Sequence, residues 1–387
     1  MAHSHGSASP LPNDTRMLGR PAVIHPGVSN GPVLSYTPIF SKHQEPTVID
    51  RFLQLQPDAA TEQFLQEYCT GGETIFTDAM AHVLKWMSWS RTDINATLGR
   101  GQMYVISHQA VRSLLTASGC SKNWQAKSIL DVGAGDGNVT RTALEPLLLP
   151  SSMVTEGGAK NEQRQIVTTE CSAPMATCLR ARGYVCLETT DLAAVQGQLY
   201  LYATIDRDSN KKSTSSTSSS TSSTSSTSAS RTRRTYDFIS VFNVLDRADR
   251  PQSLLYDIRK WLTPEKGRCI ISVVLPFCPF VEDGQTQRKP TEDLAMNGGR
   301  CLENASFERA VDCMITNVFE KSGFLVHSWS KTPYICSGDR TCPYYVLYDA
   351  VFCLSCPSTT NNNKKNNNNK KKKKIKKGVQ EDQGAAM

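Results

Sequence analysis

The sequence predicts an α/β protein with a mostly parallel, seven-stranded sheet that ends in an antiparallel hairpin and is preceded by a mostly helical segment. Three observations predict this fold. From residue 128 onwards, short apolar β-branched runs alternate with helical patterns, as expected for parallel strands joined by crossover helices. A glycine-rich turn separates the first run from its helix. The last two strand-like runs, 324–330 and 344–354, have no helix between them.

Composition divides the chain into four segments. Residues 1–47 are rich in Pro, Gly, Ser, Asn and His without an apolar period, and we expect a disordered arm. Residues 48–118 have mostly helical patterns and are expected to form a cap or lid. Residues 119–356 hold the α/β domain, interrupted by a disordered Ser/Thr-rich insertion at 207–235. Residues 357–387 form an Asn/Lys-rich tail, also expected to be disordered.

The net charge of +7 comes from the tail, which carries nine lysines and only two acidic residues. The rest of the chain is neutral, whereas a dedicated nucleic-acid enzyme carries basic residues on its folded surface. We therefore expect no nucleic-acid partner beyond a weak contact of the tail. The Lys-rich stretch 364–377 is equally compatible with a nuclear-localisation segment or a tolerated terminal repeat.

The cysteines indicate an intracellular protein. The 13 cysteines lie in apolar segments without a framework spacing, and residues 1–20 lack the apolar core of a signal peptide. The longest apolar run, 269–281, contains two prolines and is too short to cross a bilayer. We expect a cytoplasmic or nuclear protein without membrane insertion. Cys353 and Cys356 have the spacing of a redox or zinc pair but lack the strand–helix context, so we predict no metal site.

The turn after the first strand carries the clearest chemical signal. Residues 128–132 form a short apolar run, and a helical pattern continues to 148. Glycines let the backbone turn sharply and approach a ligand, with the helix N-terminus behind. The turn has the form DxGxGxG instead of the dinucleotide pattern GxGxxG. Its two carboxylates disfavour a pyrophosphate and suit a cationic, ammonium-bearing ligand, as in the first motif of class I methyltransferases. We predict S-adenosyl-L-methionine as cofactor, held by Asp131, Gly133, Gly135, Asp136 and Gly137; a strand–helix turn of another α/β protein is the alternative.

The next two strands also end in acids. The run 165–170 ends in Glu170, where this fold hydrogen-bonds the ribose hydroxyls of a nucleoside. A polar loop insertion accounts for the wide spacing from the glycine turn. A third strand, 184–191, ends in Asp191, which is either the partner of the adenine edge or an ordinary helix cap.

The remaining elements complete a Rossmann-like class I methyltransferase. The run 236–243 is apolar almost throughout, as expected for a central parallel strand. It directly follows the Ser/Thr tract, so the tract is a loop expansion at one end of the sheet. A helix at 251–262, a fifth strand at 268–277 and a helix within 303–323 come before the terminal hairpin.

The segment after the fourth strand reads Asn243-Val-Leu-Asp246, which lacks the two prolines and the aromatic residue of amino-group nucleic-acid methylases. Together with five other segments, it resembles the DREV family, the methyltransferase-like protein nine group, over roughly residues 60–355. The six segments are 99–107, 130–137, 243–251, 275–282, 333–339 and 344–352. The chain departs from the family pattern at Cys278, where a histidine is expected, and in its two insertions.

The resemblance implies a protein-histidine methyltransferase that modifies the Nπ atom of histidine in His-x-His segments with a small middle residue. It also implies that Asn243 orients the histidine or the cofactor and that Tyr345 lines the same pocket. For this chemistry a carboxylate should accept the Nτ–H of the substrate imidazole, and we choose Asp246, three residues past Asn243. Arg100 is a candidate for the cofactor carboxylate. A helix cap, a core aromatic and a surface arginine are the alternatives for Asp246, Tyr345 and Arg100.

The chain carries a His-x-His segment of its own at Ala2-His3-Ser4-His5. If the implied specificity holds, His3 or His5 is a candidate substrate of the protein itself, besides other proteins that contain such segments. An inert terminus or a chance metal clip are the alternatives for these residues. A small-molecule methyltransferase of the same fold and a non-catalytic scaffold are the competing functions, and the intact glycine turn argues against the scaffold.

Overall fold

The computed structural model describes most of the chain between residues 34 and 357. The described ranges are 22–23, 34–42, 44–68, 75–86, 89–99, 101–148, 165–202, 204–205, 234–283, 286–294, 305–337 and 344–357. The segments that were expected to be disordered fall largely outside these ranges, as do His3, His5 and Arg100.

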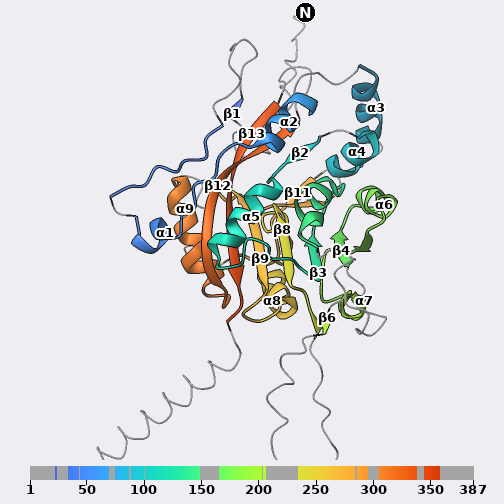
Figure 1. Ribbon diagram of the computed structural model, residues 1–387. Coiled ribbons are helices and arrows are strands. Elements are labelled where there is room, and N and C mark those ends of the chain that lie inside the picture. The colour runs from blue at the N-terminus through green and yellow to red at the C-terminus, as the bar shows by residue number, and fades with distance from the viewer. Residues whose placement is uncertain are drawn as a thin grey trace, which may run out of the picture.

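One large sheet organises the fold, with the strand order β2-β12-β13-β9-β8-β3-β4-β5 (Figure 1). Five neighbouring strands run parallel, and β13 joins them antiparallel between β9 and β12. The strands are β1 (Ala22–Val23), β2 (Met103–Tyr104), β3 (Ser128–Val132), β4 (Gln165–Glu170), β5 (Val185–Glu188), β8 (Phe238–Phe242), β9 (Arg268–Val274), β12 (Leu325–Ser337) and β13 (Tyr344–Ser355).

The predicted fold class is confirmed, with a correction to the strand count. All seven predicted strands are present, and two short strands extend the sheet to nine: β2 pairs with β12, and β1 pairs with β13 beyond the part that β9 covers. These two strands were not predicted because each has only two residues, too few for an alternating pattern. β12 also continues to Ser337, beyond its predicted end at residue 330.

Helices cover both faces of the sheet (Figure 1). One face packs against α5 and a π-helical turn at Thr140–Leu144, through residues such as Ile129, Leu114 and Leu144. The other face packs against α8 and α9 around Ile239, Ile258 and Val311. The helices are α1 (Pro46–Asp50), α2 (Ala59–Tyr68), α3 (Ile75–Trp86), α4 (Arg91–Leu98), α5 (His108–Ala117), α6 (Ala173–Ala181), α7 (Gln196–Tyr202), α8 (Pro251–Trp261) and α9 (Phe307–Cys313).

Several predicted boundaries change. Residues 34–42 of the expected arm are described, and the Ile39 amide donates to Glu308 Oε1 at 2.7 Å. Residues 234–235 of the expected insertion form β7 (Arg234–Thr235), which pairs with β6 (Thr204–Ile205) and joins the two ends of the insertion. The helix expected after the glycine turn is a π-helical turn followed by a 3₁₀ turn at Glu145–Leu147.

The segment after β9 forms a short hairpin of β10 (Val281–Asp283) and β11 (Thr286–Arg288). Neither strand was predicted. Among the described helices, none has the length and apolar character needed to cross a membrane.

Candidate active site

The glycine turn after β3 forms the first half of the candidate site. Gly133, Gly135 and Gly137 all have positive φ, at 68°, 58° and 82°, a conformation that costs other residues about 1–2 kcal/mol. A Cβ on Gly133 would lie 2.4 Å from a methyl of Val244, in the loop after β8. A Cβ on Gly135 would meet no atom within 4 Å. The turn therefore packs against the protein at Gly133 and faces open space at Gly135.

Asp131 supports this turn from inside the sheet. Its carboxylate is 2% exposed and accepts hydrogen bonds from Thr140 Oγ1 at 2.6 Å and Ser240 Oγ at 2.7 Å. Burial raises its pKa to about 6, and the charge of Glu170 adds to the rise. Both oxygens are thus engaged by protein hydroxyls, so Asp131 fixes β3, β8 and the start of the next helical turn.

Glu170 ends β4 and lies beside the glycine turn. Its Oε2 accepts from the Gly135 amide at 2.9 Å, and its Oε1 accepts from the amides of Cys171 and Ser172 at 2.8 and 3.0 Å. The structure therefore brings together the acid predicted for the ribose and the glycine that faces open space.

The acid inside the turn, Asp136, has a local role in this structure. Its Oδ1 accepts from the Asn138 amide at 2.9 Å, and its Oδ2 pairs with Arg182 at 3.4 Å. It therefore caps the helical turn that follows the glycines.

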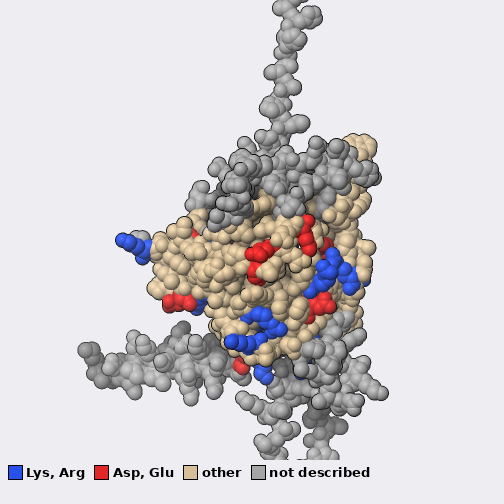
Figure 2. Space-filling model, turned by 45° about the horizontal axis from the view of Figure 1, so that its top comes forward, with Lys and Arg blue, Asp and Glu red and all other residues tan. Residues whose placement is uncertain are grey.

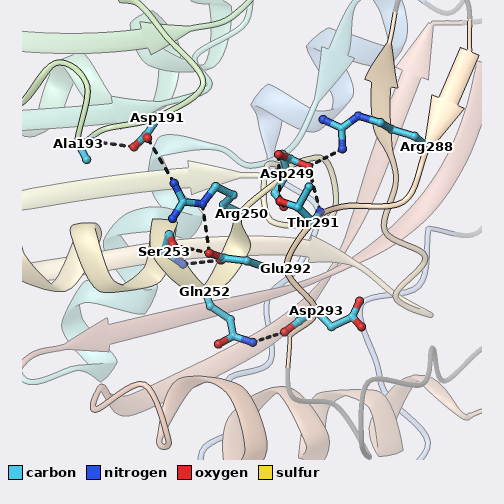
Figure 3. A network of polar contacts seen from close by, with 10 residues as sticks. All are labelled: Asp191, Ala193, Asp249, Arg250, Gln252, Ser253, Arg288, Thr291, Glu292 and Asp293. Atoms are coloured by element: carbon cyan, nitrogen blue, oxygen red, sulfur yellow. Dashed lines mark hydrogen bonds and ion pairs between the residues drawn. The ribbon is translucent and has the colours of Figure 1, made fainter.

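Asp191 lies three residues beyond the end of β5 and caps the turn after it. Its Oδ1 accepts from the Ala193 amide at 2.8 Å, and its Oδ2 lies 3.8 Å from the Arg250 guanidinium. Arg250 also donates to Glu292 at 3.2 Å (Figure 3). The geometry agrees with the helix-cap alternative for Asp191. The ion pair connects this acid to Arg250 in the loop after β8, and Arg250 in turn contacts Glu292 in the segment after β9.

The network in Figure 3 ties that segment to the start of α8. Glu292 accepts from the Ser253 amide at 2.8 Å, and so caps the first turn of α8. Asp249 accepts from Arg288 Nη1 at 2.5 Å and from the Thr291 amide at 3.0 Å. These contacts hold the β10–β11 hairpin next to the loop after β8.

Asn243, at the end of β8, begins the second half of the site. Its φ is 55°, uncommon for a residue with a side chain. The side-chain amide is held on both sides, because its Nδ2 donates to Asp349 Oδ2 at 2.9 Å and its Oδ1 accepts from Ser272 Oγ at 3.1 Å. Ser272 lies on β9 and Asp349 on β13, so three strands fix one amide.

Asp246 follows three residues later and is buried, with 3% of its surface exposed. Its Oδ2 pairs with Arg247 at 3.3 Å, and the guanidinium of Arg247 lies 3.7 Å from the ring centre of Phe280. The Phe280 amide donates to the Asp246 carbonyl at 2.9 Å. Burial raises the pKa of Asp246 against the lowering effect of Arg247. Its Oδ1 is buried without a hydrogen-bond partner, so this carboxylate can accept a bond from a ligand.

Tyr345 lies on β13, opposite Cys336 of β12 and beside Val23 of β1. Because side chains alternate along a strand, Tyr345 and Asp349 share one face of β13, about 13 Å apart at ~3.3 Å per residue. The structure thus places Tyr345 near the start of β13, on the same face as Asp349, which holds the Asn243 amide.

Sequence reasoning missed Asp349, Ser272 and the contribution of α4. Asp349 is fully buried, and a lone acid inside the apolar run 344–354 was the available signal. On α4, Thr92 donates to Glu282 of β10 at 3.0 Å, and Asp93 accepts from Ser172 at 2.6 Å. The helix therefore connects the loop after Glu170 to the hairpin after β9.

These features define a class I methyltransferase that depends on S-adenosyl-L-methionine. The residues present fit this cofactor. There is open space next to Gly135, and the Glu170 carboxylate, a hydrogen-bond acceptor, lies beside that space. Within the described residues, no three His, Cys, Asp or Glu side chains gather in a way that could hold a metal ion.

The chain belongs to the DREV methyltransferase family, whose sequence profile matches residues 40–214 and 221–356. Solved structures with a similar arrangement are distant. The cyclase SpnF is 12% identical, with 72% of this chain and 96% of that chain covered and a TM-score of 0.32. An O-methyltransferase family protein from Burkholderia thailandensis is 12% identical, with 79% of this chain and 78% of that chain covered and a TM-score of 0.29. A methyltransferase dependent on S-adenosylmethionine, from Methanosarcina mazei, is 9% identical, with 61% of this chain and 94% of that chain covered and a TM-score of 0.29.

Proposed function

We propose that this methyltransferase modifies proteins, on the Nπ atom of histidine in His-x-His segments with a small middle residue. The observation that supports this proposal most directly is Asp246, a buried carboxylate with one unpartnered oxygen, three residues beyond the clamped Asn243. A neutral imidazole offers one N–H to such an acceptor.

In this proposal Asp246 selects the reactive form of the substrate. A neutral imidazole has one N–H and one lone pair, and only the nitrogen with the lone pair is a nucleophile. An acceptor at Nτ–H leaves the lone pair on Nπ, and its negative charge stabilises the imidazolium that forms, as the aspartate of a serine-protease triad does. Arg247 balances the charge of Asp246 while leaving its Oδ1 available.

The cofactor side of the site uses the first three parallel strands. S-adenosyl-L-methionine supplies an electrophilic methyl group when bound. Glu170 is the proposed acceptor for the ribose hydroxyls, next to the space at Gly135. Asp131 acts as a positioning residue beneath the turn, because it lies within the sheet, 2% exposed, where Thr140 and Ser240 hold its two oxygens. Asp191 remains the proposed partner of the adenine edge, which would require a rearrangement of its pair with Arg250.

The N-terminal His3-Ser4-His5 is a proposed substrate within the chain itself. β1 pairs with the start of β13, with Ala22 opposite Val346 and Val23 opposite Tyr345. The 16 residues between His5 and Ala22 would span roughly 20–24 Å as a flexible chain, at ~5–6 Å × √n. That span exceeds the ~13 Å between Tyr345 and Asp349 along β13.

Nucleic acid is not proposed as a substrate. Figure 2 shows acidic side chains near the middle of the described surface on one face, with Lys and Arg side chains beside and below them. A weak contact of the Lys-rich tail with nucleic acid stays a proposal that rests on composition alone.

The test is methyl transfer from labelled S-adenosylmethionine to a His-Ala-His peptide, with Gln-Ala-Gln as the matched control. We expect label in the first peptide only, and acid hydrolysis should give Nπ-methylhistidine. Label confined to the Nτ atom, or to small metabolites in a cell extract, would contradict the proposal and favour a small-molecule methyltransferase.

A further inference from the structure

Unpartnered buried oxygens gather in one corner of the sheet. Among the described residues, five buried side-chain atoms have no hydrogen-bond partner, and three of them are Asp246 Oδ1, Asp349 Oδ1 and Thr332 Oγ1. Thr332 and Asp349 are directly opposite each other on β12 and β13, and Asp246 lies close enough for its charge to act on Asp349. Buried polar atoms normally have partners, so this corner has free capacity for polar groups of a ligand.

Asp349 uses its two oxygens differently. Oδ2 accepts from the Asn243 amide at 2.9 Å, which together with Ser272 determines the orientation of that amide. Oδ1 is the unpartnered atom. The side chain is therefore anchored to Asn243 through one oxygen, while its other oxygen is buried without a hydrogen-bond partner.

The environment of Asp349, above all its burial, favours the neutral form of its carboxyl group. It is fully buried, and burial together with the charge of Asp246 raises its pKa to about 8. Among the described residues, Tyr334 of β12 also faces it, and Arg247 pairs with Asp246. Burial also raises the pKa of Asp246, but Arg247 opposes that rise. Of the two acids, Asp349 is therefore the one whose environment more strongly favours the neutral form, and the two can have distinct roles.

We propose that Asp349 is a positioning residue of the methyl-transfer site, where it holds the Asn243 amide through Oδ2 and offers Oδ1 to the substrate beside Asp246. This inference rests on the proposed placement of methyl transfer at Asn243 and Asp246. Asp349 forms and breaks no covalent bond. A neutral Asp349 adds no second negative charge to the corner, and Arg247 balances the charge of Asp246. The corner then does not favour a substrate that is already protonated and has lost its lone pair.

The experiment compares Asp349→Asn with Asp349→Ala. The Asn side chain keeps the shape, can accept from the Asn243 amide through its own oxygen, and cannot ionise. We expect Asp349→Ala to lower kcat ~10–100-fold, as small misplacements of oriented groups do, while Asp349→Asn stays within a few-fold of wild type at pH 7. Affinity for S-adenosylhomocysteine should change little in both, because the cofactor half lies on other strands. Asp312→Ala is the matched control, since Asp312 on α9 is also a buried acid with an unpartnered oxygen, and its kcat should be unchanged.

Wild-type kcat in Asp349→Ala, or an equal loss in the Ala and Asn variants, would overturn the positioning role. A second measurement needs no substrate and covers the case in which Asp349→Ala fails to fold. The folded state of the wild type retains a proton that the unfolded state releases near pH 4, so wild-type stability should fall between pH 4 and about 8 relative to Asp349→Asn. If the difference in melting temperature between wild type and Asp349→Asn does not change over this pH range, the raised pKa of Asp349 is contradicted. A wild type that methylates no histidine peptide would refute the proposed function and leave this measurement intact.

Discussion

Replacing Gly135 with alanine should separate cofactor binding from stability. Gly135 has a φ of 58°, and a Cβ there would meet no protein atom within 4 Å. The only effect on the folded protein is therefore backbone strain, about 1–2 kcal/mol. For a domain of this size, 1 kcal/mol lowers the melting temperature by roughly 2–4 °C. The new methyl group, however, points into the space next to Glu170, where we place the cofactor.

Gly119→Ala provides the matched control. Gly119 also has a positive φ, at 84°, and its Cβ would also meet no atom within 4 Å, but it follows α5, away from the glycine turn. Thermal unfolding should show similar losses for both variants. Isothermal titration with S-adenosylhomocysteine should show at least a ~10-fold weaker Kd, about 1.4 kcal/mol, for Gly135→Ala only. Equal affinities in the two variants would refute the placement of the cofactor beside Gly135.

The remaining predictions concern the transfer half and the terminal segments. Asp246→Ala should lower kcat ~10²–10³-fold, about 3–4 kcal/mol, as loss of a preorganised electrostatic group does; unchanged turnover on a His-Ala-His peptide would reduce its role to that of a loop residue. Deleting residues 206–233, which leaves β6 and β7 paired, should shift the melting temperature little, because a doubling of loop length costs only ~0.6 kcal/mol. A large drop would mean that the insertion packs against the fold. Incubation with S-adenosylmethionine should add the mass of one methyl group to residues 2–6, and the adduct should be absent from His3→Ala/His5→Ala; a preparation active on peptides but unmodified would exclude self-methylation.

The strands and the glycine turn could be predicted because their signals are local. β3, β8 and β9 are mostly apolar and almost fully buried, as expected for central parallel strands, and the glycines mark the positions where φ is positive. The Asn243 clamp could not be predicted from spacing, because Asn243 meets Asp349 only through the register of β13, 106 residues away. Asp131 shows the same limit: the motif predicted an acid at the end of β3, but only the structure shows both its oxygens bonded within the protein.

Besides the pairing of β3 with β8, the two halves of the site meet where Gly133 packs against Val244. The cofactor half depends on β3, β4 and β5, and the transfer half on β8, β9 and β13. A Cβ at Gly133 would lie 2.4 Å from a methyl of Val244, so glycine is required there by the neighbouring loop as well as by its φ of 68°. Val244 directly follows Asn243, so the packing that allows the glycine turn to form also fixes the backbone of the clamped asparagine. The glycine of the cofactor motif and the asparagine of the transfer half are therefore constrained by the same side chain, which explains why the DxGxGxG turn and the Asn243 loop have to be considered as one site.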